Sequence, residues 1–419
     1  MELERLRGDS HWLYTVASIG RWLSICRREK QRPKRPAQIY VNGRFLQQPV
    51  TGIQRYGREL LRVWDGLIER REINPNQLKI TVLVPRGKLD PPRLRHIEIA
   101  RVGRLRGQLW TQLELPVCSK DGLLFSPDNL QPLMSPYLGK SVVTVHDLTF
   151  RLFPRAHTTA FRILYGLLIP SAIRNASALV TPSEAEKANL LGHYPKAKDR
   201  ISVVHLGSPP IEASAPRRRP LRQAQMGSPE RYILWVGSLI SRKNPQGAID
   251  AAAIVNQEIH LPLVIVGTGH RGMKSTRIKL PASDSVQIPE RFTPSEELVA
   301  LYRSAVCLLF PTFYEGFGLP AVEAMAYGCP VITSDIPVMR EVCGDAALYC
   351  NPNRPEDIAD KVKLLAANAE MQIQLRARGL RRAAQFSWER CARETLQVLQ
   401  KVIREDDAEG SELAPTFST

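Results

Sequence analysis

The sequence predicts an α/β protein with two doubly wound parallel-sheet domains. Short apolar runs of strand length alternate with amphipathic stretches of helix length along most of the chain, a pattern typical of parallel sheets covered by helices. A chain of 419 residues is long enough for two such cores. A stretch rich in Pro, Arg and Ser without periodicity, residues 208–230, separates the two halves, and we interpret it as a linker.

The composition is that of a globular protein, with 43% hydrophobic and 24% charged residues. Lys and Arg number 58 against 41 Asp and Glu, which gives a formal net charge of +17. Nucleic acid, an anionic membrane surface or a phosphorylated substrate could balance this charge. The Arg cluster of the linker lacks interleaved aromatic residues, so no specific nucleic-acid partner is expected.

The seven cysteines are scattered and form no CxxC pair. Neither a disulfide framework nor a zinc site is indicated, and a reducing cytoplasm fits this usage best.

Residues 1–37 form a basic N-terminal extension. Within it, residues 11–26 place Trp12, Val16, Ile19 and Leu23 on one helical face, and the run RREKQRPKRP follows. The apolar part is too short for a transmembrane helix and lacks a signal-peptide cleavage site. An amphipathic helix lying on an anionic membrane is one interpretation, and a packed or disordered extension is the other.

The first domain is expected over residues 38–207. Its first strand, 38–42, leads into the loop GRFLQQPVTGIQRYG and a helix that starts near Ile53, so a loop meets a helix N-terminus that can bind an anion. The alternative is that Thr51 only caps this helix. Further strands are predicted at 79–84, 122–126, 141–145, 179–181 and 201–204, and further helices at 109–118, 161–176 and from Ser183 to Leu191.

The strand 141–145 runs directly into His146 and Asp147. A His-Asp pair at the carboxyl end of a buried parallel strand lies where open α/β sheets bind ligands. The alternative is a histidine whose hydrogen bonds are satisfied within the core or a loop.

The second domain is expected over residues 231–385, followed by a C-terminal helix at 386–403 and a disordered tail at 404–419. It opens with the strand 232–236, the turn GSLISRKNP and the helix 246–256. The sequence GTGHRG, from Gly267 to Gly272, fits GxGxxG formally. No apolar-periodic helix follows it, which argues against a dinucleotide site.

The stretch 311–335, PTFYEGFGLPAVEAMAYGCPVITSD, predicts a strand end, a tight glycine-rich turn, a short helix and a strand. Gly316 and Gly318 permit positive φ and close approach of a ligand, while Pro320 suits the first turn of a helix. The N–H groups at this helix start make an anion site. Glu315 precedes the site and Glu323 lies on the helix that leaves it, so a ligand bearing phosphate and hydroxyl groups would use both carboxylates.

The segment EGFGLPAVEAMAYGCPVI strongly resembles the Glu-x7-Glu motif of retaining glycosyltransferases of family 4. These enzymes have the GT-B fold, two Rossmann-like domains facing a cleft, and use nucleotide-sugar donors. The resemblance implies that Glu315 holds hydroxyls of the donor sugar and Glu323 those of the ribose. It implies further donor-binding residues, namely Gly52, Gly237, Ser238, Gly316, Phe317, Gly318 and Leu319.

The same resemblance implies roles for several other residues. His146 would lie by the transferred sugar, and Gln54, Arg55 and Asp147 would lie on the acceptor side. Lys243 stands at the position of the family's Lys that meets the donor diphosphate, whereas Ser238 stands where many members have Arg. Arg242 is the candidate for the missing cation, because a guanidinium binds phosphate oxygens bidentately.

The implied activity is hexose transfer with retention of configuration, through front-face attack on an oxocarbenium-like state. The sequence contains no Asp-x-Asp motif, so metal independence is predicted, and no cofactor is expected. The motifs GRFLQQPVTGIQRY, VHD and RKN resemble those of bacterial mannosyl- and rhamnosyl-type transferases that build surface polysaccharides on lipid carriers. This favours GDP-mannose as donor, with UDP-linked donors as the alternative, and a glycan or lipid-linked acceptor.

The expected location is the cytoplasm, with peripheral association on the cytoplasmic face of the inner membrane as an open alternative. A sugar-nucleotide epimerase, a GT-B phosphorylase with pyridoxal phosphate and a non-catalytic basic binding module are the alternative functions.

Overall fold

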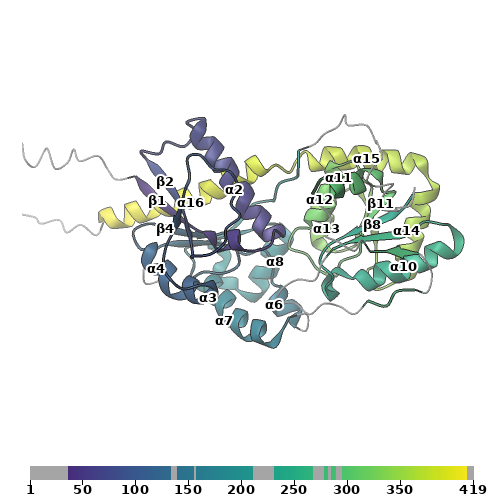
Figure 1. Cartoon of the computed structure of the whole chain (residues 1–419), viewed down its shortest axis with the longest axis horizontal. Helices are drawn as coiled ribbons and strands as arrows, with labels where there is room; N and C mark the ends of the chain where they lie inside the picture. Colours follow the sequence, from purple (N-terminus) through teal and green to yellow (C-terminus); the bar gives the residue numbers. More distant parts are fainter. Residues whose placement is uncertain are drawn as a thin grey trace, which may run out of the picture.

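The structure is a computed structural model that describes residues 36–133, 139–154, 157–210, 231–267, 278–281, 285–288 and 295–412. Two α/β domains lie side by side along its longest axis (Figure 1). The expected membrane-binding segment 11–26 and nearly all of the expected linker 208–230 lie outside the described residues. No helix in the described ranges has the length and apolar character needed to cross a bilayer.

The first domain is built on a seven-stranded sheet in the order β3-β2-β1-β4-β5-β6-β7, with every neighbouring pair parallel. Its buried apolar strands match the sequence pattern, as expected for a sheet covered on both faces. The edge strand β3 is the exception, because its residues are exposed or half-buried and carry no apolar run. The strands are β1 (Ala37–Asn42), β2 (Leu78–Val84), β3 (Glu98–Arg101), β4 (Leu123–Ser126), β5 (Ser141–Thr144), β6 (Ala178–Thr181) and β7 (Ile201–Val203).

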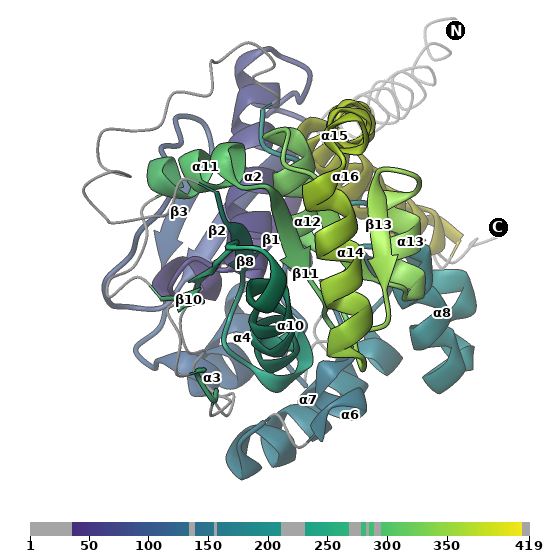
Figure 2. The same cartoon turned by 90° about the vertical axis from the view of Figure 1, so that its right-hand side faces the viewer.

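Helices cover both faces of this sheet (Figures 1 and 2). Helix α2 (Gly52–Glu69) buries Tyr56, Leu60 and Trp64 along one stripe, as its 3.6-residue periodicity predicts. The others are η1 (Gly43–Gln47), α3 (Gly107–Leu109), the π-helical η2 (Trp110–Glu114), α4 (Leu115–Cys118), α6 (Thr149–Leu152), α7 (Thr159–Asn175), α8 (Glu184–His193) and η4 (Pro195–Arg200).

The second domain has a six-stranded parallel sheet in the order β10-β9-β8-β11-β12-β13. The prediction of two doubly wound parallel-sheet domains is therefore confirmed. Its strands are β8 (Ile233–Val236), β9 (Leu263–Val266), β10 (Val286–Gln287), β11 (Cys307–Phe310), β12 (Val331–Ser334) and β13 (Ala347–Cys350). Its helices are η5 (Ser241–Lys243), α10 (Pro245–Glu258), α11 (Ser295–Ser304), α12 (Leu319–Ala326), α13 (Pro337–Cys343), α14 (Pro355–Ala367) and α15 (Ala369–Ala383).

The strand order of each sheet reverses at one point, between β1 and β4 in the first domain and between β8 and β11 in the second. Doubly wound sheets bind ligands beyond the carboxyl ends of the strands at such a point. The loop after β1 leads to Gly52, and His146 lies two residues beyond the end of β5, next to this reversal point. The loops after β8 and β11 carry Lys243 and Glu315. The topology thus gathers the predicted site residues at these strand ends.

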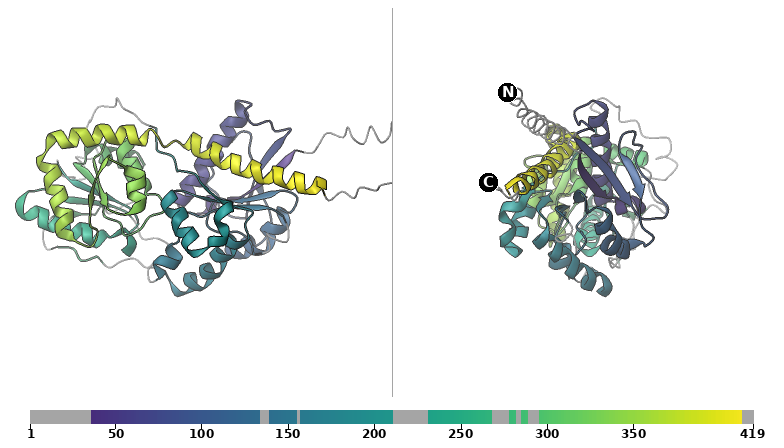
Figure 3. Two further views of the ribbon diagram at one scale, coloured as in Figure 1. Left: turned by 180° about the vertical axis from the view of Figure 1, so that it is seen from behind. Right: turned by 90° about the vertical axis from the view of Figure 1, so that its left-hand side faces the viewer.

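The final helix, α16 (Trp388–Glu412), leaves the second domain and packs along α2 of the first (Figure 3). The indole N–H of Trp64 donates to the carbonyl of Ala392 at 2.9 Å. Disorder is expected from Arg404 onward, but the helix continues to Glu412. Residues rich in Glu, Asp and Ala extend an existing helix easily, because the costly nucleation step has already occurred in the packed part.

Candidate active site

The turn between β11 and α12 has the predicted form. Gly318 lies in the left-handed region at φ 97° and precedes the first turn of α12, where Pro320 follows. Within the described part of the chain, the backbone N–H groups of Phe317, Gly318 and Leu319 donate to no protein acceptor. They are the unpaired donors of a helix start, where the helix dipole also favours negative charge. The Phe317 side chain packs inward against Phe386, with ring centroids 5.4 Å apart, so only its backbone faces this site.

Glu315 is held between the two predicted cations. Its Oε1 lies 2.9 Å from Arg242 Nη1 and 2.9 Å from Lys243 Nζ, and accepts a hydrogen bond from Thr312 Oγ1 at 3.1 Å. All three charged side chains are buried, with about a tenth of each exposed. We call Glu315, Arg242 and Lys243 the charged cluster. By itself the cluster carries two positive charges against one negative charge.

Burial and mutual attraction set the ionisation of the charged cluster. Burial by itself would raise the pKa of Glu315, but the charges of Arg242 and Lys243 outweigh it and hold that pKa below its ordinary value. Burial lowers the pKa of Lys243, and the charge of Glu315 opposes this effect only in part. Burial acts the same way on Arg242, but there Glu315 and Asp147 prevail and raise the pKa.

The short helix η5 fixes both cations. Asn244, which follows Lys243, takes the left-handed conformation at φ 53° and caps α10 by accepting from the Gly247 N–H at 3.1 Å. Arg242 Nη1 donates to the Tyr314 carbonyl at 2.8 Å, which ties η5 to the turn after β11. Gly237 lies against Lys243, since a Cβ there would be 3.2 Å from Lys243 Cδ. Ser238 contributes its carbonyl to the turn, accepting from the Ile240 N–H at 2.8 Å.

Glu323 pairs with a residue of the other domain. Its Oε1 forms an ion pair with Arg55 of α2, and its Oε2 accepts from the hydroxyl of Tyr302 at 3.0 Å. Burial and the charge of Glu323 raise the pKa of Tyr302, so this hydroxyl remains a donor. Arg55, expected on the acceptor side, thus lies against the carboxylate expected to bind ribose.

The N-terminus of α2 faces the N-terminus of α12. A Cβ on Gly52 would be 3.5 Å from Leu319 Cδ1, so two helix starts approach each other across the domain interface. Gln54 is turned toward its own helix: its Oε1 accepts from the Thr51 N–H at 3.1 Å, and its Nε2 donates to Gln48 at 2.6 Å. This is the capping arrangement given above as the alternative for Thr51, and in this structure it occupies the Gln54 side chain.

His146 is buried and oriented by its neighbours. Its backbone N–H donates to Asn129 Oδ1 at 2.7 Å, and its Nε2 donates to the Pro127 carbonyl at 2.8 Å. Burial lowers its pKa, so the ring is neutral near pH 7. Asp147 accepts from the N–H and hydroxyl of Thr149, the first residue of α6.

The backbone of His146 lies directly against the glycine-rich turn. A Cβ on Gly316 would be 1.8 Å from the His146 carbonyl oxygen, so no larger residue fits there without a shift. The Ser183 hydroxyl donates to the Gly316 carbonyl at 2.8 Å. The turn of the second domain and the strand ends of the first are therefore in contact.

Sequence reasoning missed a buried acid at this interface. Glu186 of α8 is fully buried and accepts from the Tyr314 hydroxyl at 2.6 Å and from Asn189 at 3.1 Å. Burial raises its pKa to about 8, with a contribution from the nearby charge of Asp147. Tyr314 also accepts from the Leu148 N–H at 2.9 Å. The one sequence signal was Ser183-x-x-Glu186, a capping-box pattern that predicts a helix start and no interdomain contact.

A second missed residue, Glu341 of α13, also joins the domains. Its carboxylate accepts from the backbone N–H groups of Glu184 and Ala185, each at 2.8 Å, and from His205 Nε2 at 2.9 Å. A carboxylate at the N-terminus of α8 is favourable for the helix dipole. Burial would raise the pKa of Glu341, but the hydrogen bond from His205 and those from the backbone lower it overall.

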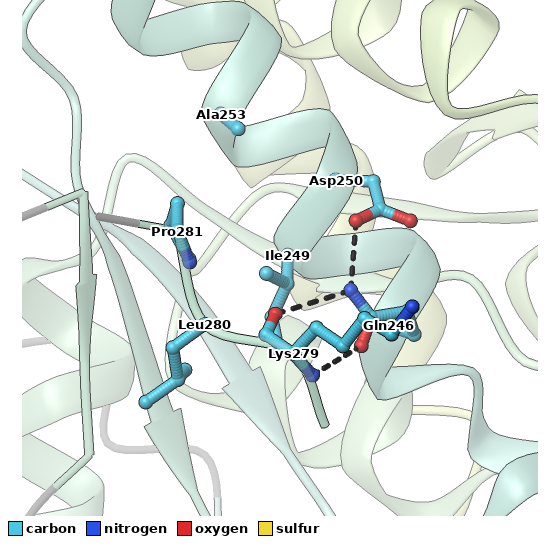
Figure 4. A pocket seen from close by; sticks show the side chains of 7 residues that line it. All are labelled: Gln246, Ile249, Asp250, Ala253, Lys279, Leu280 and Pro281. Atoms are coloured by element: carbon cyan, nitrogen blue, oxygen red, sulfur yellow. Dashed lines mark hydrogen bonds between the residues drawn. The ribbon is translucent and has the colours of Figure 1, made fainter. Parts of the chain in front are cut away.

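A pocket of about 590 Å³ lies elsewhere in the second domain, between α10 and residues 279–281. Figure 4 shows Gln246 bonded to Asp250 and to the backbone of Lys279 in its wall. None of the predicted site residues lines it. Among the residues that the structure describes, no three His, Cys, Asp or Glu side chains gather in a way suited to a metal ion.

Comparisons with known proteins show which family and which fold the chain is similar to. Residues 219–382 match the profile of the family described as Glycosyl transferases group 1. The crystal structure of WaaG, a glycosyltransferase involved in lipopolysaccharide biosynthesis, superposes with a TM-score of 0.64 over 87% of this chain and 99% of that chain, at 15% identity. The structural neighbours define the class of fold: the chain has the GT-B fold. Its second half is similar to the group 1 glycosyltransferase family over the matched residues.

Two relatives are more specific. The chain is 28% identical over 386 residues to the O-antigen chain mannosyltransferase B of Escherichia coli, covering 84% of this chain and 97% of that protein. It is 27% identical over 229 residues to the O-antigen chain mannosyltransferase RfbU of Salmonella typhimurium, covering 54% of this chain and 61% of that protein.

Proposed function

We propose that the protein is a retaining glycosyltransferase of family 4 that transfers mannose from GDP-mannose to a glycan or lipid-linked acceptor in surface-polysaccharide synthesis. The observation that carries this proposal is the charged cluster beside the free N–H groups at the start of α12. Two buried cations contact Glu315, and three backbone N–H groups that begin two residues after it have no acceptor within the described part of the chain. In this proposal the donor diphosphate binds to both sets of donors. The mannosyl donor is supported by the two relatives described as O-antigen mannosyltransferases.

The chemistry follows from where negative charge develops. Cleavage of the bond between sugar and phosphate leaves charge on the nucleoside diphosphate, and Lys243, Arg242 and the α12 N–H groups stabilise it. Such preorganised groups act strongly in a site that excludes water, and one of them is typically worth about 3–4 kcal/mol of the barrier. Protein cations then perform the task that a divalent metal performs in other transferases, and transfer needs no metal.

The remaining residues bind and orient the two substrates. Glu315 accepts from hydroxyls of the donor sugar once the diphosphate engages its cations, and Glu323 with Tyr302 binds the ribose hydroxyls. Neutral His146 lies beside the sugar, with Nε2–H fixed on Pro127 so that Nδ1 remains an acceptor. Asp147, on the acceptor side, lies close enough to Arg242 to raise its pKa. The acceptor hydroxyl then attacks the anomeric carbon from the face that the diphosphate leaves. The bond between the anomeric carbon and the phosphate oxygen breaks, and the hydroxyl proton passes to that departing phosphate oxygen.

Calorimetric titration tests the proposal most directly. GDP, UDP, ADP, dTDP and NAD are titrated into the protein in EDTA, with Lys243→Ala and the surface variant Lys361→Ala as test and control. We expect GDP alone to bind tightly, Lys243→Ala to weaken it and Lys361→Ala to leave it unchanged. If UDP binds tightly in place of GDP, the transferase proposal stands and the donor is a UDP-linked sugar. If no nucleotide binds, or only NAD does, the proposed donor site is refuted.

Transfer itself is measured with labelled GDP-mannose and a lipid-linked glycan. Release of the label by an α-mannosidase establishes retention, because the donor is an α-linked sugar. Turnover that persists in EDTA establishes metal independence.

A further inference from the structure

One edge of the first domain exposes apolar side chains to solvent. Leu109, Leu113 and Val117 recur every four residues along the segment α3–η2–α4, with 63%, 59% and 59% of their surface exposed. On α7, Ile163 and Leu167 are 73% and 61% exposed. Single exposed apolar residues are ordinary, whereas a group of them on adjoining helices marks an interaction surface.

These helices adjoin one another. Gln108 of α3 donates to the hydroxyl of Tyr165 of α7 at 3.2 Å. Figures 1 and 2, two views at right angles, both place α3, α4, α6 and α7 along the lower edge of the first domain. Together, the exposed apolar residues of these helices form an apolar edge: Leu109, Leu113, Val117, Leu152, Ile163, Leu164 and Leu167.

Helix α7 is apolar on both of its sides. Leu168, Ile169 and Ile173 are buried in the first domain, while Ile163 and Leu167 point outward into solvent. A helix at the surface of a globular protein normally carries charged or polar residues on its outer face. An outer face of Ile and Leu is stable in contact with another apolar phase, so the sequence of α7 indicates a partner.

The charges around the apolar edge are almost all positive. Arg104, Arg106, Arg151 and Arg162 are exposed beside it. Over residues 103–120 and over the described part of 148–175, Glu114 is the one acidic residue. Its carboxylate accepts from the backbone N–H of Arg104 at 2.8 Å, so it is turned toward its own loop. A partner with apolar chains and negative groups complements this surface.

We propose that the apolar edge docks on an anionic lipid bilayer. Leucine and isoleucine side chains would enter the acyl region while the arginines remain at the headgroups, the arrangement of an interfacial amphipathic surface. A second copy of this chain would set like charges against each other, which opposes association. Nucleic acid would pair with the arginines and leave the leucines in water. The lipid surface is the occupant that both observations favour.

The apolar edge also adjoins the active-site interface. Helix α6 begins at Thr149, two residues after Asp147, and Phe153 at its end stacks on Tyr314 of the second domain with ring centroids 5.7 Å apart. A lipid-linked acceptor anchored in the bilayer under α7 would therefore present its sugar close to the charged cluster. This last step alone rests on the proposed function; the docking itself does not.

The test locates the lipid contact by fluorescence. An environment-sensitive nitrobenzoxadiazole probe is attached through Leu167→Cys in the full chain. Cys26→Ser and Cys118→Ser remove two other thiols, and the remaining five cysteines are buried. The control carries the probe through Ile373→Cys on α15, a side chain that is 61% exposed in the second domain. With vesicles of phosphatidylcholine and phosphatidylglycerol, we expect a blue shift and quenching by brominated lipids at position 167 and neither at position 373.

A second measurement uses unlabelled protein. In vesicle sedimentation, the double substitution Ile163→Gln and Leu167→Gln should lower the partition coefficient about tenfold, because two apolar side chains no longer enter the bilayer. Ile373→Gln should leave it unchanged. GDP titration of the same variants separates the two proposals, since nucleotide binding does not involve the apolar edge. Equal probe spectra at positions 167 and 373 would overturn the lipid assignment. So would a double variant that partitions into vesicles as strongly as the wild type, or one whose self-association changes while its partitioning does not.

Discussion

Replacing Glu315 by Gln tests how the charges of the active site are held. The carboxylate lies 2.9 Å from both Arg242 Nη1 and Lys243 Nζ, and all three side chains are buried. Gln keeps the size of Glu and removes its charge, which leaves two adjacent cations without the carboxylate that contacts them. Removing one partner from a buried ion pair costs about 3–5 kcal/mol. We expect the free energy of unfolding of Glu315→Gln to fall by this amount.

The same substitution should strengthen the binding of free GDP. In the wild type, Glu315 forms ion pairs with the two cations that a diphosphate would bind. A unit charge about 5 Å away contributes roughly 3 kcal/mol at an effective dielectric constant near 20. Solvent and the remaining carboxylates reduce this interaction energy, so we expect Glu315→Gln to bind GDP about tenfold more tightly than the wild type. Mannose transfer should fall at the same time, because the hydroxyl contacts of Glu315 are lost.

Urea unfolding followed by tryptophan fluorescence, with and without GDP, measures both effects. At a GDP concentration 100 times its Kd, the nucleotide should restore about 2.7 kcal/mol to Glu315→Gln. Glu389→Gln is the matched control, since Glu389 pairs with Arg393 in an exposed position where such pairs contribute about 0–1 kcal/mol. Unchanged stability together with unchanged GDP affinity would refute the charged cluster as a preformed anion site.

Three other perturbations address separate parts of the site. Lys243→Ala should lower kcat/KM for the donor by about 100-fold to 1,000-fold, the typical cost of removing one stabilising group, in a steady-state transfer assay. Gly316→Ala places a Cβ 1.8 Å from the His146 carbonyl, so we expect kcat to fall, while Gly192→Ala, where nothing lies within 4 Å, should match the wild type. Glu186, with a pKa of about 8 against an ordinary 4.5, binds a proton more tightly in the folded protein. Its contribution to stability is complete below pH 4.5 and is lost as the pH rises to about 8, at up to about 1.4 kcal/mol per pH unit. Unfolding of Glu186→Gln between pH 5 and 8.5 should lack this component, and a slope equal to that of the wild type would contradict the assignment.

Local sequence patterns were sufficient for most of the fold. Strands such as β8 and β11 are buried on both faces and are visible as short apolar runs. The strand β3 was missed because an edge strand needs no apolar run, and its place depends on pairing with β2. The last helix was predicted too short, because its polar end carries no periodic apolar signal.

The predictability of the site divides in the same way. Lys243 and Glu315 each follow a strand at the reversal point of one sheet, so their proximity could be inferred from local sequence and topology. The pairing of Arg55 with Glu323 joins residues 268 positions apart in different domains. It depends on how the two domains meet, and no local pattern encodes that. Glu186 was missed for the same reason, since its burial arises from contact with Tyr314.

The path of α16 has a consequence for the order in which the chain folds. Ribosomes complete the first domain's sheet long before residues 388–402 are made, yet the Trp64 indole and the Tyr56 hydroxyl find partners on that helix. Until then, part of the apolar stripe of α2 has no cover. Full burial of this stripe therefore has to wait until the second domain and α16 have been synthesised, and until then the exposed apolar surface favours aggregation.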